Sequence, residues 1–367
     1  MPRPKAHVAG IGAAALVCLA GAGMATTTDD LIPPSDARIA VMGRVDRSDP
    51  ARMRIGYPGV TVRVRFEGGS LSMRVAATTA DCHIAVILDG GEPRVVRLAK
   101  GASEVSLAEG LASGEHTVDV VHRTETWVGV VTLLGLRLGP GARLLDAPAW
   151  PRRRMLFIGD SVTCGEGVDR APEHRQGRPA GWNPYLSYGM LLARRFDAQC
   201  QLVCFGGRGL LRDWQGRRDV LNAPQFFDLA VPDELAPPAW DHAAYPPDVV
   251  IVSLGTNDFN LGIGELPDRE EWVETYVRFV RTIRSHYPDA HILLTEGAIV
   301  DDTPERGQRS TLRAYIAQTV ARLADPKVRA IESRHYSGDA ADAHPPGAAH
   351  AAMARDLEPF IRAAVGW

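Results

Sequence analysis

One change of hydrophobic pattern, between residues 138 and 151, limits what this chain can fold into. Before it, short runs such as residues 60–66 and 117–122 alternate apolar and polar side chains, and turn sequences rich in Gly, Ser and Asp separate them. This alternation is typical of β-strands that bury one face. After it, compact apolar runs alternate with stretches of helical periodicity, as in a sheet covered by helices. The 367 residues are therefore expected to form two domains of different class.

The first domain is predicted over residues 37–140. Its strands are short, turn sequences recur between them, and helical periodicity is absent from the sequence there, which favours a β-sandwich or jelly roll. A linker rich in Gly and Pro, residues 138–151, leads to the second domain, which is predicted over residues 151–367.

The second domain is expected to be a three-layer α/β/α sandwich around a parallel sheet. Four apolar runs and a weaker fifth have the continuity of strands covered on both faces. They are residues 155–158, 201–205, 249–252, 291–294 and 328–331. Apolar residues also recur on single helical faces, at Val273, Tyr276, Val277, Val280 and Ile283 and at Leu312, Tyr315, Ile316 and Leu323. Strands and helices in this order predict a doubly wound sheet with right-handed crossovers.

Residues 1–25 resemble a secretory signal peptide. Arg3 and Lys5 precede an apolar run of mostly small residues, 8–22, and residues 23–25 supply the small residues of a cleavage site. This pattern predicts a secreted or periplasmic protein. The alternative is an uncleaved anchor, because the run approaches the minimum length of a membrane span. No later stretch is apolar enough to cross a bilayer, so no integral membrane association is expected once the signal is removed.

Charge and cysteine spacing argue against two classes of function. A net charge of −3 and the lack of a Lys/Arg-rich stripe disfavour nucleic acid as a partner. Cys82, Cys164, Cys200 and Cys204 follow the signal segment. The last two flank one strand-like run whose ends lie about 13 Å apart, beyond the reach of a disulfide, and buried free thiols are expected for all four. The Cys and His spacings do not predict a zinc site.

Chemically active residue types follow the predicted strands. Ser161 comes directly after the first strand, within Gly-Asp-Ser, and Gly207 follows the second. Asn257 follows the third strand, within Gly-Thr-Asn-Asp, and Asp342 and His344 precede the last predicted helix. Because the carboxyl ends of parallel strands meet at one edge of a sheet, these side chains are expected to converge there.

This set of residues suits acyl transfer. A serine hydroxyl becomes an effective nucleophile when a neighbouring base takes its proton, and His344 is the candidate base for Ser161. The tetrahedral intermediate needs hydrogen-bond donors for its oxyanion. The candidates are the backbone N–H groups of Ser161 and Gly207 and the side-chain amide of Asn257.

Asp342 is the candidate group that orients the imidazole of His344. A spacing of two residues places both side chains on one face of an extended segment, and Pro345 favours that extended conformation.

His350 is a competing histidine, but its place in the final helix favours packing, and His242 has no motif around it. Each site residue alone has an ordinary explanation as a helix cap or turn residue, so it is their joint occurrence that indicates a site.

These residues resemble the SGNH (GDSL-type) hydrolases, whose four blocks contribute Ser, Gly, Asn and His in this chain order. The lipase-type sequence Gly-x-Ser-x-Gly is absent, because Thr163 occupies its last position. SGNH members usually space Asp and His three apart, whereas Asp342 and His344 are two apart and are followed by Pro. That departure resembles carbohydrate esterase family 2, which also places a jelly-roll domain before the catalytic one. Further similarities lie at residues 116–118, 123–125, 163–167 and 207–210.

The resemblance covers both predicted domains and implies a serine esterase that removes acetyl groups from polysaccharides such as xylan and glucomannan. It implies an acetylated carbohydrate as the partner and no metal or organic cofactor. Some members are said to orient the histidine with a backbone carbonyl, so the role of Asp342 stays open. Two other interpretations also stay open: an SGNH lipase or thioesterase acting on lipid esters, and a carbohydrate-binding protein with little turnover.

Aromatic side chains are expected to bind the sugar, because sugar rings stack on aromatic faces. Trp182 and Trp214 lie in loop-like segments after motif residues and are the candidate platforms; the alternative is that they wedge the two domains together. Arg208 is a candidate contact to sugar hydroxyls, or else pairs with an acid. The polar run 169–181 is a candidate wall of the cleft or an ordinary solvated loop.

Overall fold

The computed structural model describes residues 31–170, 178–232 and 237–367. The predicted signal peptide, residues 1–25, lies outside the described residues. Among the residues described, no helix is both long enough and apolar enough to span a membrane. By their contacts, residues 32–367 form one unit.

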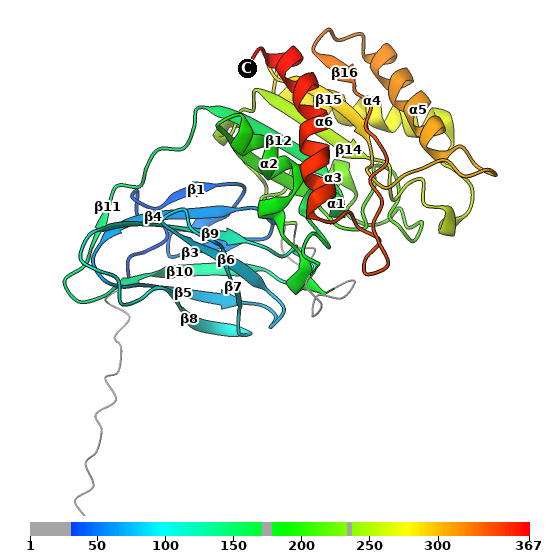
Figure 1. The fold of residues 1–367 in the computed structure, drawn as a ribbon. Coiled ribbons are helices and arrows are strands. Elements are labelled where there is room, and N and C mark those ends of the chain that lie inside the picture. The colour runs from blue at the N-terminus through cyan, green and yellow to red at the C-terminus, as the bar shows by residue number, and fades with distance from the viewer. Residues whose placement is uncertain (1–30, 171–177, 233–236) are drawn as a thin grey trace, which may run out of the picture. The chain divides into compact units, whose positions relative to one another are not determined.

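The first part of the chain folds into two antiparallel sheets (Figure 1). One sheet contains β1 (Ala40–Met42), β4 (Thr61–Glu67), β9 (Glu115–His122), β6 (His83–Leu88) and β7 (Arg94–Arg97) in that order, and β11 (Arg143–Leu145) pairs with β4. The other contains β2 (Asp46–Asp49), β3 (Arg52–Ile55), β10 (Val131–Leu138), β5 (Leu71–Ala77) and β8 (Gly101–Ala108) in that order. The predicted β-sandwich class is confirmed, although β11 lies within the expected linker.

Strand β4 shows why this part of the chain forms a sandwich. Val62, Val64 and Phe66 are buried in the core, and the residues between them face outward. Arg63 stands opposite Asp119 of β9 and donates two hydrogen bonds of 2.7 Å to that carboxylate. One face of the strand therefore packs on apolar neighbours, while the other is linked to the next strand by an ion pair.

The second part of the chain contains a sheet of five parallel strands. They are β12 (Arg153–Gly159), β13 (Ala198–Cys204), β14 (Val249–Leu254), β15 (His291–Glu296) and β16 (Val328–Ala330). Their order is β13-β12-β14-β15-β16, so the chain moves outward in both directions from β12. All five predicted strands are present, and β13 begins earlier than predicted because Ala198 already pairs with Arg153. The predicted parallel α/β/α class is confirmed.

Helices cover both faces of this sheet (Figure 1). They are α2 (Tyr188–Arg195), α4 (Arg269–His286), α5 (Gln308–Leu323) and α6 (Gly347–Val365). Along β12, Leu156 and Ile158 share a core with α4 and α5, whereas Met155 and Phe157 share a core with α2 and α6. Successive strand residues point to opposite faces, so an uninterrupted apolar run is what a sheet covered on both sides requires.

The remaining helical segments are short and lie in the connections. They are α1 (Ser161–Cys164), α3 (Ala223–Phe226), η2 (Pro179–Gly181), η3 (Pro184–Leu186), η4 (His242–Ala244) and η5 (Leu261–Ile263).

One cysteine prediction is wrong. Cys164 and Cys204 form a disulfide, with Cα atoms 5.6 Å apart, whereas Cys82 and Cys200 are free and buried as expected. Cys204 stands beside Gly159 in the β12–β13 register, and the single turn of α1 brings Cys164 back over that strand end. The disulfide joins two neighbouring strand ends. The distance between Cys200 and Cys204 along one strand therefore did not exclude it.

Buried polar contacts join the sandwich to the parallel sheet. Arg44, which is 1% exposed, donates hydrogen bonds to the carbonyl oxygens of Phe227 and Leu229. The hydroxyl of Tyr57 donates to the carbonyl oxygen of Phe226 at 2.7 Å. Because buried polar groups are costly unless paired, these contacts hold the two parts in a defined arrangement.

Candidate active site

Ser161 lies at the sharp turn between β12 and α1, at the carboxyl edge of the parallel sheet. Asp160 caps the helix: its carboxylate accepts a hydrogen bond from the N–H of Val162 at 3.1 Å. As the first helical residue, Ser161 has a backbone N–H without an acceptor inside the helix. Gly159 allows the tight turn, since a Cβ there would lie 2.0 Å from the Thr163 hydroxyl oxygen. The tight turn at Gly159 and the helix cap of Asp160 therefore fix the backbone on both sides of Ser161.

His344 lies beside this serine, just before α6. Its Nε2 is 2.9 Å from the Oγ of Ser161, and its Nδ1 is 2.8 Å from Oδ1 of Asp342. The same carboxylate oxygen accepts the backbone N–H of His344 at 2.9 Å. Ser161, His344 and Asp342 thus form one continuous chain of hydrogen bonds, the arrangement that serine acyl transfer requires of a nucleophile, a base and an orienting carboxylate.

The surroundings of His344 favour its protonated form. Burial lowers the pKa of His344, but the hydrogen bond to Asp342 and the negative charges of Glu166 and Asp342 outweigh it, so the pKa lies above its ordinary value of 6.5. Burial raises the pKa of Asp342, and the hydrogen bonds from His344 reverse this, so that the pKa is lowered. Asp342 is therefore ionised when His344 takes a proton, and the ion pair stabilises that state.

The other two predicted site residues follow neighbouring strands. Gly207, after β13, has a φ of +74°, which favours glycine, and a Cβ there would lie 2.6 Å from the ring of Trp214. Asn257, after β14, donates from its side-chain nitrogen to the carbonyl oxygen of Arg208 at 2.8 Å. An amide nitrogen carries two hydrogens, so Asn257 has a second donor besides this hydrogen bond.

The turn that carries Gly207 is held by a buried carboxylate. Asp258 accepts hydrogen bonds of 2.7–3.1 Å from the backbone N–H groups of Leu210, Leu211 and Arg212. Gly209 allows this approach, because a Cβ there would lie 2.4 Å from Asp258. Both Asn257 and Asp258 of the Gly-Thr-Asn-Asp segment are therefore bonded to the backbone of the turn that follows β13.

Two glutamates near the histidine have no assigned role at the level of sequence. Glu166, five residues after Ser161, places an oxygen 3.8 Å from Nε2 of His344. Glu125 extends from the sandwich, is 2% exposed, and accepts a hydrogen bond from the backbone N–H of Gly206. Both fall within segments that carry the family resemblance, which is the only sequence signal that pointed to them.

The structure separates the two candidate sugar platforms. Trp214 is 52% exposed and lies against Gly207, so it presents a face to solvent beside the site. Trp182 is 1% exposed and contacts the ring of Trp127 of the sandwich, with centroids 5.1 Å apart. A buried ring offers no surface to a sugar, so the prediction for Trp182 is wrong and the alternative, a wedge between the two parts, describes it better.

Two further candidates also make internal contacts. Arg208 is 11% exposed and lies 3.6 Å from the carboxylate of Asp213, so it pairs with an acid. In the polar run 169–181, Asp169 pairs with the buried Arg123 of the sandwich at 2.6 Å. Residues 171–177 of that run lie outside the described residues.

The competing histidine takes no part in this chain of hydrogen bonds. His350 is fully buried in α6, its Nδ1 accepts the backbone N–H of Tyr188 at 3.1 Å, and its ring stacks on the ring of Tyr188. Burial lowers the pKa of His350 to about 3, so the ring is neutral. Packing, rather than catalysis, explains this histidine.

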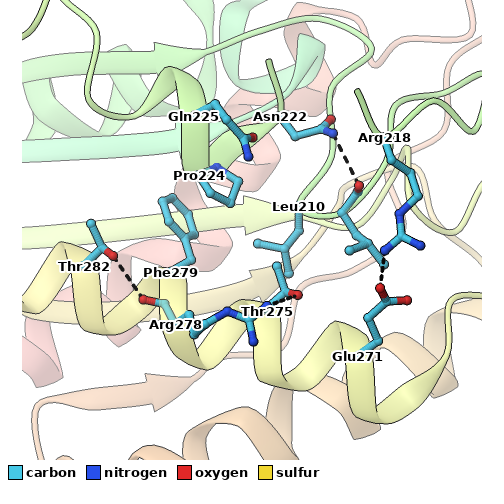
Figure 2. Close-up of a pocket in the computed structure, with 11 residues that line it drawn as sticks. Leu210, Arg218, Asn222, Pro224, Gln225, Glu271, Thr275, Arg278, Phe279 and Thr282 are labelled. Atoms are coloured by element: carbon cyan, nitrogen blue, oxygen red, sulfur yellow. Dashed lines mark hydrogen bonds and ion pairs between the residues drawn. The ribbon is translucent and has the colours of Figure 1, made fainter. Parts of the chain in front are cut away.

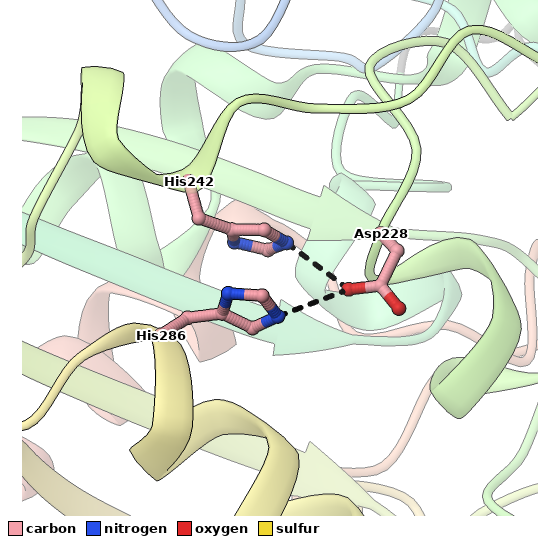
Figure 3. A group of neighbouring side chains, drawn as sticks. All are labelled: Asp228, His242 and His286. Carbon is pink, nitrogen blue, oxygen red and sulfur yellow. Dashed lines mark hydrogen bonds and ion pairs between the residues drawn. The ribbon is translucent and has the colours of Figure 1, made fainter.

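His242 belongs to a group that lies at the opposite edge of the sheet. Asp228, His242 and His286 gather closely enough to be considered for a metal ion (Figure 3). Since His242 precedes β14 and His286 ends α4 before β15, the group lies at the amino ends of the strands. The two rings stack with centroids 3.8 Å apart and planes 17° apart, and Nε2 of His242 is 3.0 Å from Asp228. Nε2 of His286 lies 3.7 Å from the same oxygen of Asp228, so the carboxylate links both rings. The group lies at the edge of the sheet opposite to Ser161 and His344.

A cavity of about 380 Å³ lies between the segment that follows β13 and α4 (Figure 2). Among its lining residues, Arg218 pairs with Glu271, and Arg278 donates to the hydroxyl of Thr275 at 2.9 Å. Ser161 and His344 do not line it. Because its charged side chains already have partners, this cavity does not compete with the Ser161 site as the place of chemistry.

Comparisons with known proteins agree with this arrangement. Residues 41–148 match the family described as carbohydrate esterase 2 N-terminal, and residues 157–352 match the GDSL-like lipase/acylhydrolase family. An acetylxylan esterase / glucomannan deacetylase of Cellvibrio japonicus is 43% identical over 92% of this chain and 91% of that protein. The cellulase/esterase CelE of Acetivibrio thermocellus is 31% identical over 89% of this chain but only 39% of that longer protein.

Solved structures give the same result. A family two carbohydrate esterase from Cellvibrio japonicus has a TM-score of 0.86 at 41% identity, covering 92% of this chain and 98% of that chain. A family two carbohydrate esterase from Clostridium thermocellum, solved in complex with cellohexaose, has a TM-score of 0.80 at 30% identity, covering 90% of this chain and 99% of that chain.

Proposed function

The chain belongs to carbohydrate esterase family 2, and from that membership we propose that it removes O-acetyl groups from polysaccharides of the xylan or glucomannan type through an acetyl-enzyme on Ser161. The observation that carries the proposal is the continuous chain of hydrogen bonds from Ser161 through His344 to Asp342. The relative named acetylxylan esterase / glucomannan deacetylase supports the choice of substrate class.

The reaction is derived from these positions. His344 Nε2 takes the proton of Ser161 as the serine Oγ attacks the acetyl carbonyl carbon, and Asp342 stabilises the resulting imidazolium. The N–H groups of Ser161 and Gly207 and the amide of Asn257 are the proposed donors to the oxyanion. Collapse of the intermediate breaks the bond to the sugar oxygen, which leaves with the proton of His344. A water molecule, activated by the same histidine, then releases acetate.

Trp214 is the proposed platform for the carbohydrate. Its exposed indole lies against Gly207, so a sugar ring stacked on it is held next to the proposed oxyanion donors. Stacking on an aromatic face provides apolar contact without reading a particular hydroxyl, which suits binding to a polymer chain.

We also propose that the protein is exported. The pattern of residues 1–25 predicts a signal peptide, and the Cys164–Cys204 disulfide supports the idea, since disulfides persist mainly in oxidising compartments. Determining the N-terminus of the protein recovered from culture medium or periplasm tests this. Mature chains that retain residues 1–25 would contradict it.

The direct test measures acetate release from acetylated xylan and glucomannan, with acyl esters of increasing chain length in parallel. We expect release from the polysaccharides, poor turnover of long acyl chains, and loss of activity in Ser161→Ala. Preference for long-chain esters would favour a lipase or thioesterase instead.

A relative's complex with cellohexaose makes binding of glucan chains a second candidate function. Calorimetric titration with cellohexaose tests it, and binding without acetate release would favour it over catalysis.

A further inference from the structure

We propose that Glu125, supplied by the β-sandwich, is a positioning residue for the esterase: its buried carboxyl group holds the backbone at Gly206 and so fixes the direction of the neighbouring Gly207 N–H. This proposal rests on the proposed function, because it assigns the Gly207 N–H to the oxyanion. It gives the sandwich a part in the chemistry, besides any part in binding carbohydrate.

Glu125 is held rigidly in its own segment. It follows β9, and its backbone carbonyl accepts the N–H groups of Val128 and Gly129 at 3.0 and 3.3 Å. Two residues earlier, Arg123 is 1% exposed and pairs with Asp169 at 2.6 Å, which ties the end of β9 to the segment that follows the nucleophile. A side chain on a support of this kind can position a partner, because its own freedom is already lost.

Gly206 is shaped to receive this carboxyl group. The Gly206 N–H donates to Oε2 of Glu125, and a Cβ at Gly206 would lie 2.9 and 3.0 Å from the two Glu125 carboxyl oxygens. It would also lie 3.2 Å from Oε2 of Glu166. A glycine is therefore required for the two carboxyl groups to approach the backbone this closely.

The hydrogen bond between Glu125 and Gly206 fixes the peptide group next to the one that carries the Gly207 N–H. The Gly207 carbonyl oxygen accepts the N–H of Trp214 at 2.8 Å, so the turn is fixed on that side of Gly207. On the other side of Gly207, Glu125 fixes the peptide group between residues 205 and 206. The N–H of Gly207 lies between these two fixed groups, so its direction is set before substrate binds. Donors that need no reorientation during the reaction are the effective ones for a developing oxyanion.

The electrostatics of Glu125 fit a positioning role. Burial and the negative charge of Glu166 raise the pKa of Glu125, which favours its neutral form. A neutral acid still offers a carbonyl oxygen to Gly206, and it places no second negative charge beside Glu166 and His344. The role therefore depends on hydrogen-bonding reach and not on charge.

Two substitutions of Glu125 separate the effect of its side-chain length from the effect of its charge. Glu125→Gln keeps the length and an acceptor oxygen but cannot ionise, whereas Glu125→Asp keeps the carboxyl group but is one methylene too short to reach Gly206. With 4-nitrophenyl acetate, we expect Glu125→Gln to keep kcat within about threefold of wild type. We expect Glu125→Asp and Glu125→Ala to lower kcat by roughly ten- to a hundredfold, with KM nearly unchanged, because a small misplacement of a catalytic donor costs rate and not ground-state binding.

Tyr57→Phe is the matched control. It removes a buried hydrogen bond between the sandwich and the part of the chain that carries the parallel sheet, to the carbonyl oxygen of Phe226, and leaves the hydrogen bond between Glu125 and Gly206 in place. We expect it to lower the unfolding midpoint while keeping kcat. The proposal is overturned if Glu125→Asp and Glu125→Ala keep full kcat, if Glu125→Gln is as impaired as they are, or if Tyr57→Phe loses as much kcat. A wild type that releases no acetate, or an active Ser161→Ala protein, would instead overturn the proposed function.

Discussion

Replacing Glu166 by glutamine tests how charge near His344, the proposed catalytic base, sets the pKa of that histidine. One carboxylate oxygen of Glu166 lies 3.8 Å from Nε2 of His344, and the two side chains are 12% and 18% exposed. Its negative charge is one of the causes that hold the pKa of His344 above the ordinary value, against the lowering effect of burial. The substitution keeps the size of the side chain and removes this charge.

The magnitude is obtained from Coulomb's law. At 3.8 Å, with an effective dielectric constant of about 20, two unit charges interact by roughly 4 kcal/mol, which corresponds to about three pH units as an upper value. Removing a negative charge destabilises the imidazolium, so the pKa of His344 falls. Since the reaction needs neutral His344, the acid limb of the pH profile is expected to move to lower pH, by about one to three pH units.

The assay is kcat/KM for 4-nitrophenyl acetate across the pH range in which histidine titrates. Glu332→Gln is the control, because it makes the same change of charge on a side chain that is 79% exposed, and it should leave the acid limb in place. An acid limb in Glu166→Gln that stays at the wild-type position, or moves to higher pH, would refute the reasoning. It would mean that Glu166 carries no charge when His344 titrates.

Three further substitutions test the histidine, the sugar platform and the disulfide. Asp342→Ala removes the carboxylate bonded to His344 at 2.8 Å, and we expect kcat to fall by about 10²- to 10⁴-fold; a loss of less than tenfold would show that another group orients the ring. Trp214→Ala should raise KM for acetylated oligosaccharides several-fold more than KM for the aryl acetate, in keeping with about 0.5–1.5 kcal/mol for an aromatic contact, and equal changes on both substrates would speak against a sugar platform. Cys204→Ala removes a disulfide between cysteines 40 residues apart, so the free energy of unfolding in urea should fall by about 4 kcal/mol, and a change below about 1 kcal/mol would disprove a stabilising disulfide.

The parallel sheet was predictable because its strands are covered on both faces. A run such as Met155 to Ile158 has to be apolar throughout when alternate residues meet α4 and α5 on one side and α2 and α6 on the other. The active residue types were predictable from the segments directly after the strands, since all parallel strands deliver their carboxyl ends to one edge.

The disulfide was not predictable by the same reasoning. Cys164 and Cys204 lie on different segments, and their proximity depends on the β12–β13 register and on the single turn of α1. Distances along one strand carry no information about that contact. Trp182 and Trp214 also look alike in sequence, and only their packing, against Trp127 and against Gly207, separates a buried wedge from an exposed ring.

The proposed role of Glu125 could not be predicted from the sequence for the same reason. Its side chain reaches Gly206 across the contact between two parts of the chain with unrelated folds, and neither hydrophobic pattern nor local motif specifies that contact. Residues positioned by their own strand could be assigned from the sequence, whereas residues that act across this contact needed the structure.

The most direct measurement concerns the acetyl-enzyme. Rapid acid quenching of the enzyme during turnover of 4-nitrophenyl acetate, followed by mass spectrometry of peptides, locates the acetyl group. We expect one acetyl group on the peptide that contains Ser161, bound to the serine oxygen, and none in Ser161→Ala. Acetylation of a different residue, or undiminished acetate release by Ser161→Ala, would contradict the proposed mechanism.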